Sequence, residues 1–201
     1  MAQAISMRSL RIHPHLHDVF GEEQPVAYLA AILLFGAAVS AVFTLSAGPL
    51  LADLAWWRAA VALVLVLDIA AGCVANFTPS TNDFYAARPR NRWVFIAIHF
   101  HIVLVALLVG SGIAAGVIVW AYTIAAAALV NRLAGQGAQT FVGGLLLAVG
   151  FAGLPLLPGL TPAMMAVSGL FMLKVLFSFA VDHYRTVPAH DGQVSKNGGR
   201  G

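Results

Sequence analysis

Two side chains of opposite charge, Asp68 and Lys174, lie inside long apolar runs of this sequence. Each is the only carboxylate or ammonium deep within its own run, and an unpaired charge at membrane depth is costly. We therefore expect the two side chains to contact each other. Such a pair can act as a protonatable switch, because a proton or cation at Asp68 competes with Lys174 and biases the protein between two states. Alternatively, the pair is structural and only locks two helices together.

Two further polar side chains, His101 and Tyr122, are expected at the same depth. Each of the four residues lies nine positions from the polar end of its apolar run. At a helical rise of about 1.5 Å per residue, all four would lie about 13 Å from the inner membrane boundary. The sequence therefore predicts an intramembrane polar site formed by Asp68, Lys174, His101 and Tyr122.

A polar stripe leads from each charged residue toward the cytoplasmic end of its helix. Residues four positions apart share a helix face. The two stripes consist of Asp68, Gly72 and Asn76, and of Lys174, Ser178 and Asp182. They predict a half-channel from the cytoplasm to the middle of the membrane, or else polar helix ends that simply reach toward water.

Two histidines extend the second stripe into a predicted cytoplasmic mouth. This mouth is formed by Asn76, His99, Ser178, Asp182 and His183. His99, Asp182 and His183 are candidate metal ligands, because imidazole and carboxylate groups suit zinc or iron. No HxxH or HExxH spacing places two of them on one helix face, so the cofactor stays unknown. His99 and His101 diverge by about 200° on a regular helix, so at most one is expected to join the intramembrane site directly.

The elements that position these residues follow from composition. Of the 201 residues, 60% are apolar and 9% are charged, against about 25% charged in soluble domains. Six spans of about 20 residues account for most of the apolar content. The fold class predicted is therefore all-α, a polytopic bundle of six transmembrane helices. The spans are expected at residues 26–48, 56–77, 93–110, 113–130, 140–157 and 162–181, with a polar loop at 78–92.

The distribution of charge predicts the orientation of the bundle. Cytoplasmic loops carry the excess of Lys and Arg, and with the N-terminus inside, nine of the eleven basic residues fall on the cytoplasmic side. Both termini are then cytoplasmic. We divide the chain into a polar cytoplasmic N-terminal segment at 1–25, a six-helix transmembrane domain at 26–181 and a disordered cytoplasmic tail at 182–201.

One arrangement of residues resembles a known family. A lysine in the last span facing a membrane aspartate, with Trp120 and Tyr122 nearby in the sequence, resembles the retinal-binding arrangement of rhodopsins. Rhodopsins have seven spans, whereas six are predicted here. The resemblance is confined to single residues, so no rhodopsin function is carried over.

These observations favour transport or permeation of a small solute or ion, coupled to protons, because protonatable groups at mid-depth suit a relay. The alternatives are a membrane-embedded enzyme acting on a lipid or lipophilic substrate by acid–base or metal chemistry at the mouth, and a structural accessory subunit. The expected location is multi-pass in a membrane, of the bacterial inner or plasma membrane type. The expected partners are the lipid bilayer and a small solute, ion or lipophilic substrate. The sequence leaves open whether the protein forms a homo-oligomer. The net charge of +3 is too weak and scattered for a nucleic-acid partner.

Overall fold

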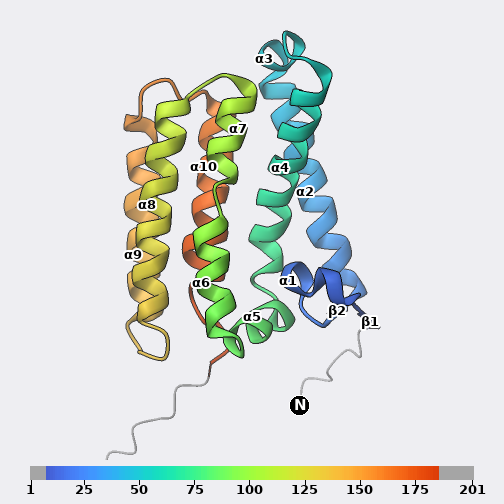
Figure 1. Ribbon diagram of the computed structural model, residues 1–201, viewed down its shortest axis with the longest axis vertical. Helices are drawn as coiled ribbons and strands as arrows, with labels where there is room; N and C mark the ends of the chain where they lie inside the picture. The colour runs from blue at the N-terminus through green and yellow to red at the C-terminus, as the bar shows by residue number, and fades with distance from the viewer. Residues whose placement is uncertain (1–7, 186–201) are drawn as a thin grey trace, which may run out of the picture.

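The computed structural model describes residues 8–185, which form an elongated helical bundle (Figure 1). Within this range, six helical segments are long and apolar enough to cross a membrane. They are α2 (Val26–Ser46), α4 (Trp56–Ala75), α6 (Pro89–Ile98) with α7 (His101–Val109), α8 (Ile113–Arg132), α9 (Gln139–Gly153) with η2 (Leu154–Leu156), and α10 (Pro162–Met172) with the π-helix η3 (Leu173–Phe179). The predicted all-α bundle of six membrane helices is confirmed.

Short elements lie at the ends of the bundle. They are β1 (Ser9–Arg11), η1 (Pro14–Leu16), α1 (His17–Phe20), β2 (Glu23–Pro25), α3 (Gly48–Ala52) and α5 (Pro79–Ala86). β1 pairs with β2 in an antiparallel register that sets Leu10 opposite Gln24. Residues 8–25 of the polar N-terminal segment are therefore folded. Of the predicted disordered tail, residues 186–201 lie outside the described part of the chain.

The N-terminal segment is fixed onto one end of the bundle, beside α5 (Figure 1). The buried Gln24 side chain donates to the Thr78 hydroxyl, and the Tyr85 hydroxyl donates to the carbonyl of Asp18 over 2.9 Å. Gly21 adopts a φ of 72°, and a Cβ there would overlap α5. Only glycine combines that conformation with so close an approach.

Much of the polar loop predicted at 78–92 is helical. Pro79 and Pro89 occupy first-turn positions of α5 and α6, where a missing N–H costs nothing. The Thr78 hydroxyl caps α5 by accepting from the amide of Thr81. The third span therefore begins at Pro89 instead of residue 93, which carries Arg90 and Arg92 into a helix.

The sixth span lies at the centre of the bundle, with α4, α8 and α9 packed around it. Its buried side chains include Phe171 and Val175, which belong to one continuous apolar core with Val66, Ile102 and Val105 of the neighbouring helices. α2 packs along the outer side of α4 (Figure 1). This core holds the second, third and sixth spans at fixed distances, and these are the spans that carry the candidate site.

The described parts of both chain ends lie at the same end of the bundle, near α5 (Figure 1). The Tyr184 hydroxyl, after the sixth span, donates to the carbonyl of Phe77, after the second. An even number of spans requires this arrangement.

Candidate functional site

Two of the six spans depart from regular α-helix at the same level. α6 ends at Ile98 and α7 begins at His101, because His99 (ψ 84°) and Phe100 (φ −114°, ψ 17°) leave the helical region. In the sixth span, residues 173–179 form a π-helix that contains Lys174. Interrupted helices at membrane depth are tolerated where the freed backbone is buried in protein or lines a cavity, and π-helical turns are frequent at functional sites. The two interruptions therefore mark this level as a candidate site.

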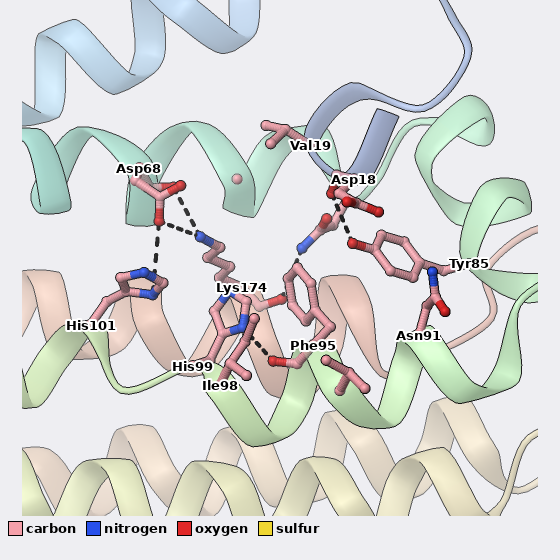
Figure 2. Close-up of a pocket in the computed structure, with 13 residues that line it drawn as sticks. Asp18, Val19, Asp68, Tyr85, Asn91, Phe95, Ile98, His99, His101 and Lys174 are labelled. Atoms are coloured by element: carbon pink, nitrogen blue, oxygen red, sulfur yellow. Dashed lines mark hydrogen bonds and ion pairs between the residues drawn. The ribbon is translucent and has the colours of Figure 1, made fainter. Parts of the chain in front are cut away.

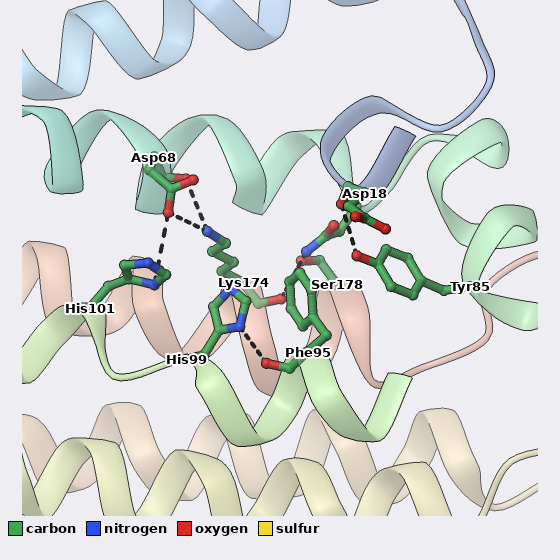
Figure 3. Close-up of polar contacts among 9 residues, drawn as sticks. Asp18, Asp68, Tyr85, Phe95, His99, His101, Lys174 and Ser178 are labelled. Carbon is green, nitrogen blue, oxygen red and sulfur yellow. Dashed lines mark hydrogen bonds and ion pairs between the residues drawn. The ribbon is translucent and has the colours of Figure 1, made fainter. Parts of the chain in front are cut away.

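The ion pair predicted from the sequence is present at this level (Figure 3). The Lys174 ammonium donates to Asp68 Oδ2 over 2.7 Å and to the Asp68 carbonyl over 3.2 Å, which confirms the expected contact. The two partners differ in exposure, since the Lys174 side chain is 4% exposed and the Asp68 side chain 39%. The carboxylate therefore faces the space beside the pair, and the ammonium lies behind it.

The neighbours of Lys174 explain how a lysine fits so deeply. A Cβ on Gly72 would lie 2.6 Å from Lys174 Cε and 2.8 Å from Nζ, so the lysine stem fills the space that glycine leaves. The Asn76 amide and the Ser178 hydroxyl both donate to the carbonyl of Lys174, over 3.3 and 2.9 Å. Two residues of the predicted mouth thus supply hydrogen-bond donors to a backbone carbonyl of the π-helix.

Both histidines of the third span reach the site, contrary to the expectation that at most one would do so. The rings of His99 and His101 lie 5.0 Å apart, edge to face, and His101 Nδ1 is 3.9 Å from Asp68 Oδ2. The 200° divergence holds only for a continuous helix, and the helix is interrupted between these residues. His99 is buried, and its ring stacks on the ring of Phe95 with centroids 3.7 Å apart. Its Nδ1 is hydrogen-bonded to the backbone carbonyl of Phe95.

A cavity of about 370 Å³ lies beside the ion pair, between α4 and α6 (Figure 2). Its inner end is polar, formed by Asp68, Asn76, His99, His101 and Lys174. Its other end reaches the N-terminal segment at Asp18 and the hydroxyl-bearing Tyr85. Burial raises the pKa of Tyr85, which therefore stays a neutral hydrogen-bond donor.

Tyr122 is not part of this site, which corrects the predicted set of four. Its hydroxyl donates to the carbonyl of Leu146 on α9 over 2.6 Å. Its ring lies against a separate, mostly apolar cavity that is also lined by Gly150 and Met172. Tyr122 was predicted at the same depth as the other three residues, but the face of α8 that carries it turns toward α9. A count of residues along a single helix gives the depth of a residue and does not give the rotation of the helix.

The three candidate metal ligands are not brought together. His99 faces the cavity, whereas the His183 ring lies between Phe77 and Phe177, with centroids 5.0 and 5.4 Å away. The Asp182 amide donates to Gln139 Oε1. Among residues 8–185, no group of three or more His, Cys, Asp or Glu side chains lies close enough to hold a metal ion. The predicted mouth is therefore divided between the cavity and the end of the sixth span.

Arg92 supports the end of the π-helix that carries Lys174, and the sequence reasoning missed this role. Its guanidinium is buried and donates to the carbonyls of Phe179 and Ala180, each over 3.1 Å. These are carbonyls that the end of the π-helix leaves without a helical partner. The signal in the sequence was Pro89, which marks a helix start three residues earlier.

The assembled groups can exchange protons: a carboxylate that accepts one, an ammonium that releases one and two imidazoles that do either. All four line one cavity at membrane depth. In comparisons with known proteins, the chain matches no family model, no curated protein and no solved structure.

Proposed function

We propose that the protein transports a small solute or ion across a membrane, and that proton movement at Asp68 and Lys174 is coupled to this transport. The observation that carries the proposal is a cavity at membrane depth that ends on an ion pair with a buried ammonium, at the level where two spans are interrupted. Substrate sites of membrane transporters are typically formed near mid-membrane by discontinuous helices.

The packing around the cavity fits one of the two states that alternating access requires. Beyond the ion pair, toward the end with α3, the bundle is filled by buried apolar residues that include Ala62, Val105 and Val109. The cavity instead extends toward Asp18 and Tyr85 at the opposite end. A proton that neutralises Asp68 weakens its attraction for Lys174 and so favours rearrangement of the helices that the pair joins.

The distribution of charge supports a cavity in the cytoplasmic half of the bilayer. The loops and ends near α5 carry most of the arginines in the described chain, and Arg58 lies near the opposite end. By the excess of positive charge in cytoplasmic loops, the end with Asp18 and Tyr85 faces the cytoplasm. We therefore infer a multi-pass protein with a state open toward the cytoplasmic side.

Proton flux in liposomes tests the proposal. Purified protein is reconstituted with a pH-sensitive dye inside the vesicles, and gradients of organic cations, organic anions and neutral solutes are imposed in turn. We expect at least one class to change the internal pH faster than in empty vesicles. The variant Asp68→Asn should reduce this flux at least about tenfold, equivalent to about 1.4 kcal/mol. If no gradient moves protons faster than in empty vesicles, the proposal fails.

Stability measurements separate transport from a purely structural pair. Asp68→Asn leaves a buried ammonium unpaired and should lower the melting temperature, whereas the double variant Asp68→Asn, Lys174→Met removes both charges and should restore it. Transport predicts that the restored double variant is still inactive. Asp53→Asn, an exposed carboxylate near α3, is the matched control and should behave as the wild type.

A further inference from the structure

The cavity opens sideways between α4 and α6. Its wall on α6 includes Val94 and Ile98, which are 57% and 54% exposed. In a bundle that spans a membrane, exposed apolar side chains of this kind face lipid chains. A molecule dissolved in the bilayer can therefore reach the polar end of the cavity without first entering water.

The order of the charges decides what such a molecule meets. Asp68 is the exposed partner of the ion pair, and Lys174 lies behind it. A group that enters between α4 and α6 thus meets the exposed carboxylate and the partly exposed imidazole of His101, whereas the ammonium is almost fully covered by protein. A carboxylate attracts a cation and repels an anionic head group.

The ion pair as a unit is neutral, so a bound cation would leave one excess positive charge in a low-dielectric site. That is costly unless a proton leaves. The charged and titratable groups that face Lys174 are Asp68 and Cys73 from α4, His99 from the break between α6 and α7, and His101 from α7. Lys174 itself can supply the proton: one N–H bond breaks, the electron pair stays on Nζ, the proton passes to water, and the cation takes the place of the ammonium beside Asp68.

We propose, resting on the transport function above, that the substrate is an amphiphilic organic cation that enters from the bilayer between α4 and α6 and exchanges for one proton of Lys174. The apolar body of the molecule packs on Val94, Ile98 and the ring of Phe95, and its charge lies against Asp68. A cavity of about 370 Å³ is within the size range of sites for small organic ligands.

Two probes of the same shape and opposite charge test the charge preference. Tetraphenylphosphonium and tetraphenylborate are titrated by calorimetry into the full chain in a neutral detergent, with weak buffer and a pH indicator. We expect saturable binding of the phosphonium alone, with release of about one proton per bound cation. The affinity should therefore rise roughly tenfold per pH unit while Lys174 starts protonated. Tighter binding of the borate, or phosphonium binding without proton release, overturns the inference.

A substitution at Lys174 tests the source of the proton. Lys174→Arg keeps the positive charge beside Asp68, but a guanidinium does not give up its proton in proteins. We expect the phosphonium affinity to fall at least about tenfold and its pH dependence to vanish. The double variant Asp68→Asn, Lys174→Met, which leaves no buried charge unpaired, should not bind phosphonium. Wild-type binding and proton release in either folded variant would contradict the exchange.

A matched pair of tryptophan substitutions tests the route. Ile98→Trp fills the sideways opening and should weaken phosphonium binding several-fold, whereas Val64→Trp places the same bulk on an exposed position of α4 that does not line the cavity. Equal effects of the two variants would contradict access between α4 and α6.

The outcomes separate this inference from the proposed function. If phosphonium binds with proton release but no solute moves protons in liposomes, the site stands and transport fails. If another class of solute drives proton flux while phosphonium does not bind, transport stands and the substrate class is wrong.

Discussion

Lys174 shows how single residues make an otherwise costly feature possible. Gly72 leaves the space for its stem, Asp68 accepts from its ammonium, and Asn76 and Ser178 occupy its carbonyl. A buried ammonium is stable only when such partners are supplied. Gly72, Asn76 and Ser178 of the two predicted polar stripes therefore hold the lysine in place.

His183 gives a prediction at the residue scale. Its ring is half-buried against Phe77 and Phe177, and desolvation lowers its pKa below the ordinary value of about 6.5. The unfolded chain takes up this proton at a higher pH than the folded chain. The stability that His183 contributes is therefore present above about pH 6.5 and is lost as the pH falls toward the lower folded pKa.

The melting temperature in detergent between pH 8 and pH 5 checks this. The wild type should lose more stability over the range than His183→Gln, because the glutamine takes up no proton. His15→Gln, at an exposed position, is the control and should follow the wild type. Parallel curves for all three proteins would show that His183 does not titrate as expected.

At the scale of elements, the site depends on where two helices stop being regular. The interruption at His99 and Phe100 turns both imidazoles toward one cavity, and the π-helix of the sixth span carries Lys174. Both interruptions release backbone groups that need other partners. Polar side chains of neighbouring elements supply several of them, and Arg92 and Gln139 both donate to the carbonyl of Ala180.

Arg92 gives the prediction at this scale. Arg92→Gln should lower the free energy of unfolding by about 1.5–3 kcal/mol, because charge-assisted hydrogen bonds to the carbonyls of Phe179 and Ala180 are lost. Denaturation in detergent measures the change. Arg90→Gln, which removes an exposed arginine two residues earlier, is the control and should change stability little. If Arg90→Gln costs as much, net charge and not the buried contacts explains the loss.

At the scale of the whole molecule, the N-terminal segment and the six spans form one structure. The cavity is bounded at one end by Asp18 and Val19 of α1, which the Tyr85 hydroxyl fixes to α5. A segment that reads as a polar tail thus completes a site within the bundle. Its docking also brings Arg8 and Arg11 to the same end as the arginines in and just before α6.

The orientation in the membrane is the prediction at this scale. A reporter fused after Gly201 should be active in the cytoplasm, because the arginine-rich end is expected there. In a Cys73→Ala background, a cysteine at the exposed position Asp53 should be labelled by an impermeant reagent from outside intact cells, and one at Arg90 should not. The reverse labelling pattern would invert the bundle and place the cavity on the outer side.

The sequence by itself determined the six spans and the contact between Asp68 and Lys174, because both follow from the cost of placing polar groups in a bilayer. That cost depends on the composition of each span and on the depth of the polar residue in the membrane, and both can be estimated from the sequence alone. The helical spacing of four also predicted that Gly72 and Asn76 share a face with Asp68, and in the structure both contact Lys174.

Only the tertiary structure decided which other groups join the pair. His99 and His101 meet because the helix stops between them, and Tyr122 is excluded because its helix turns that face toward α9. The sideways cavity, the exposed carboxylate in front of a buried ammonium and the docking of α1 likewise depend on helix rotation and on contacts between residues far apart in the chain. A count of residues along one helix specifies neither the rotation of that helix nor its long-range contacts, because packing against the other helices sets both.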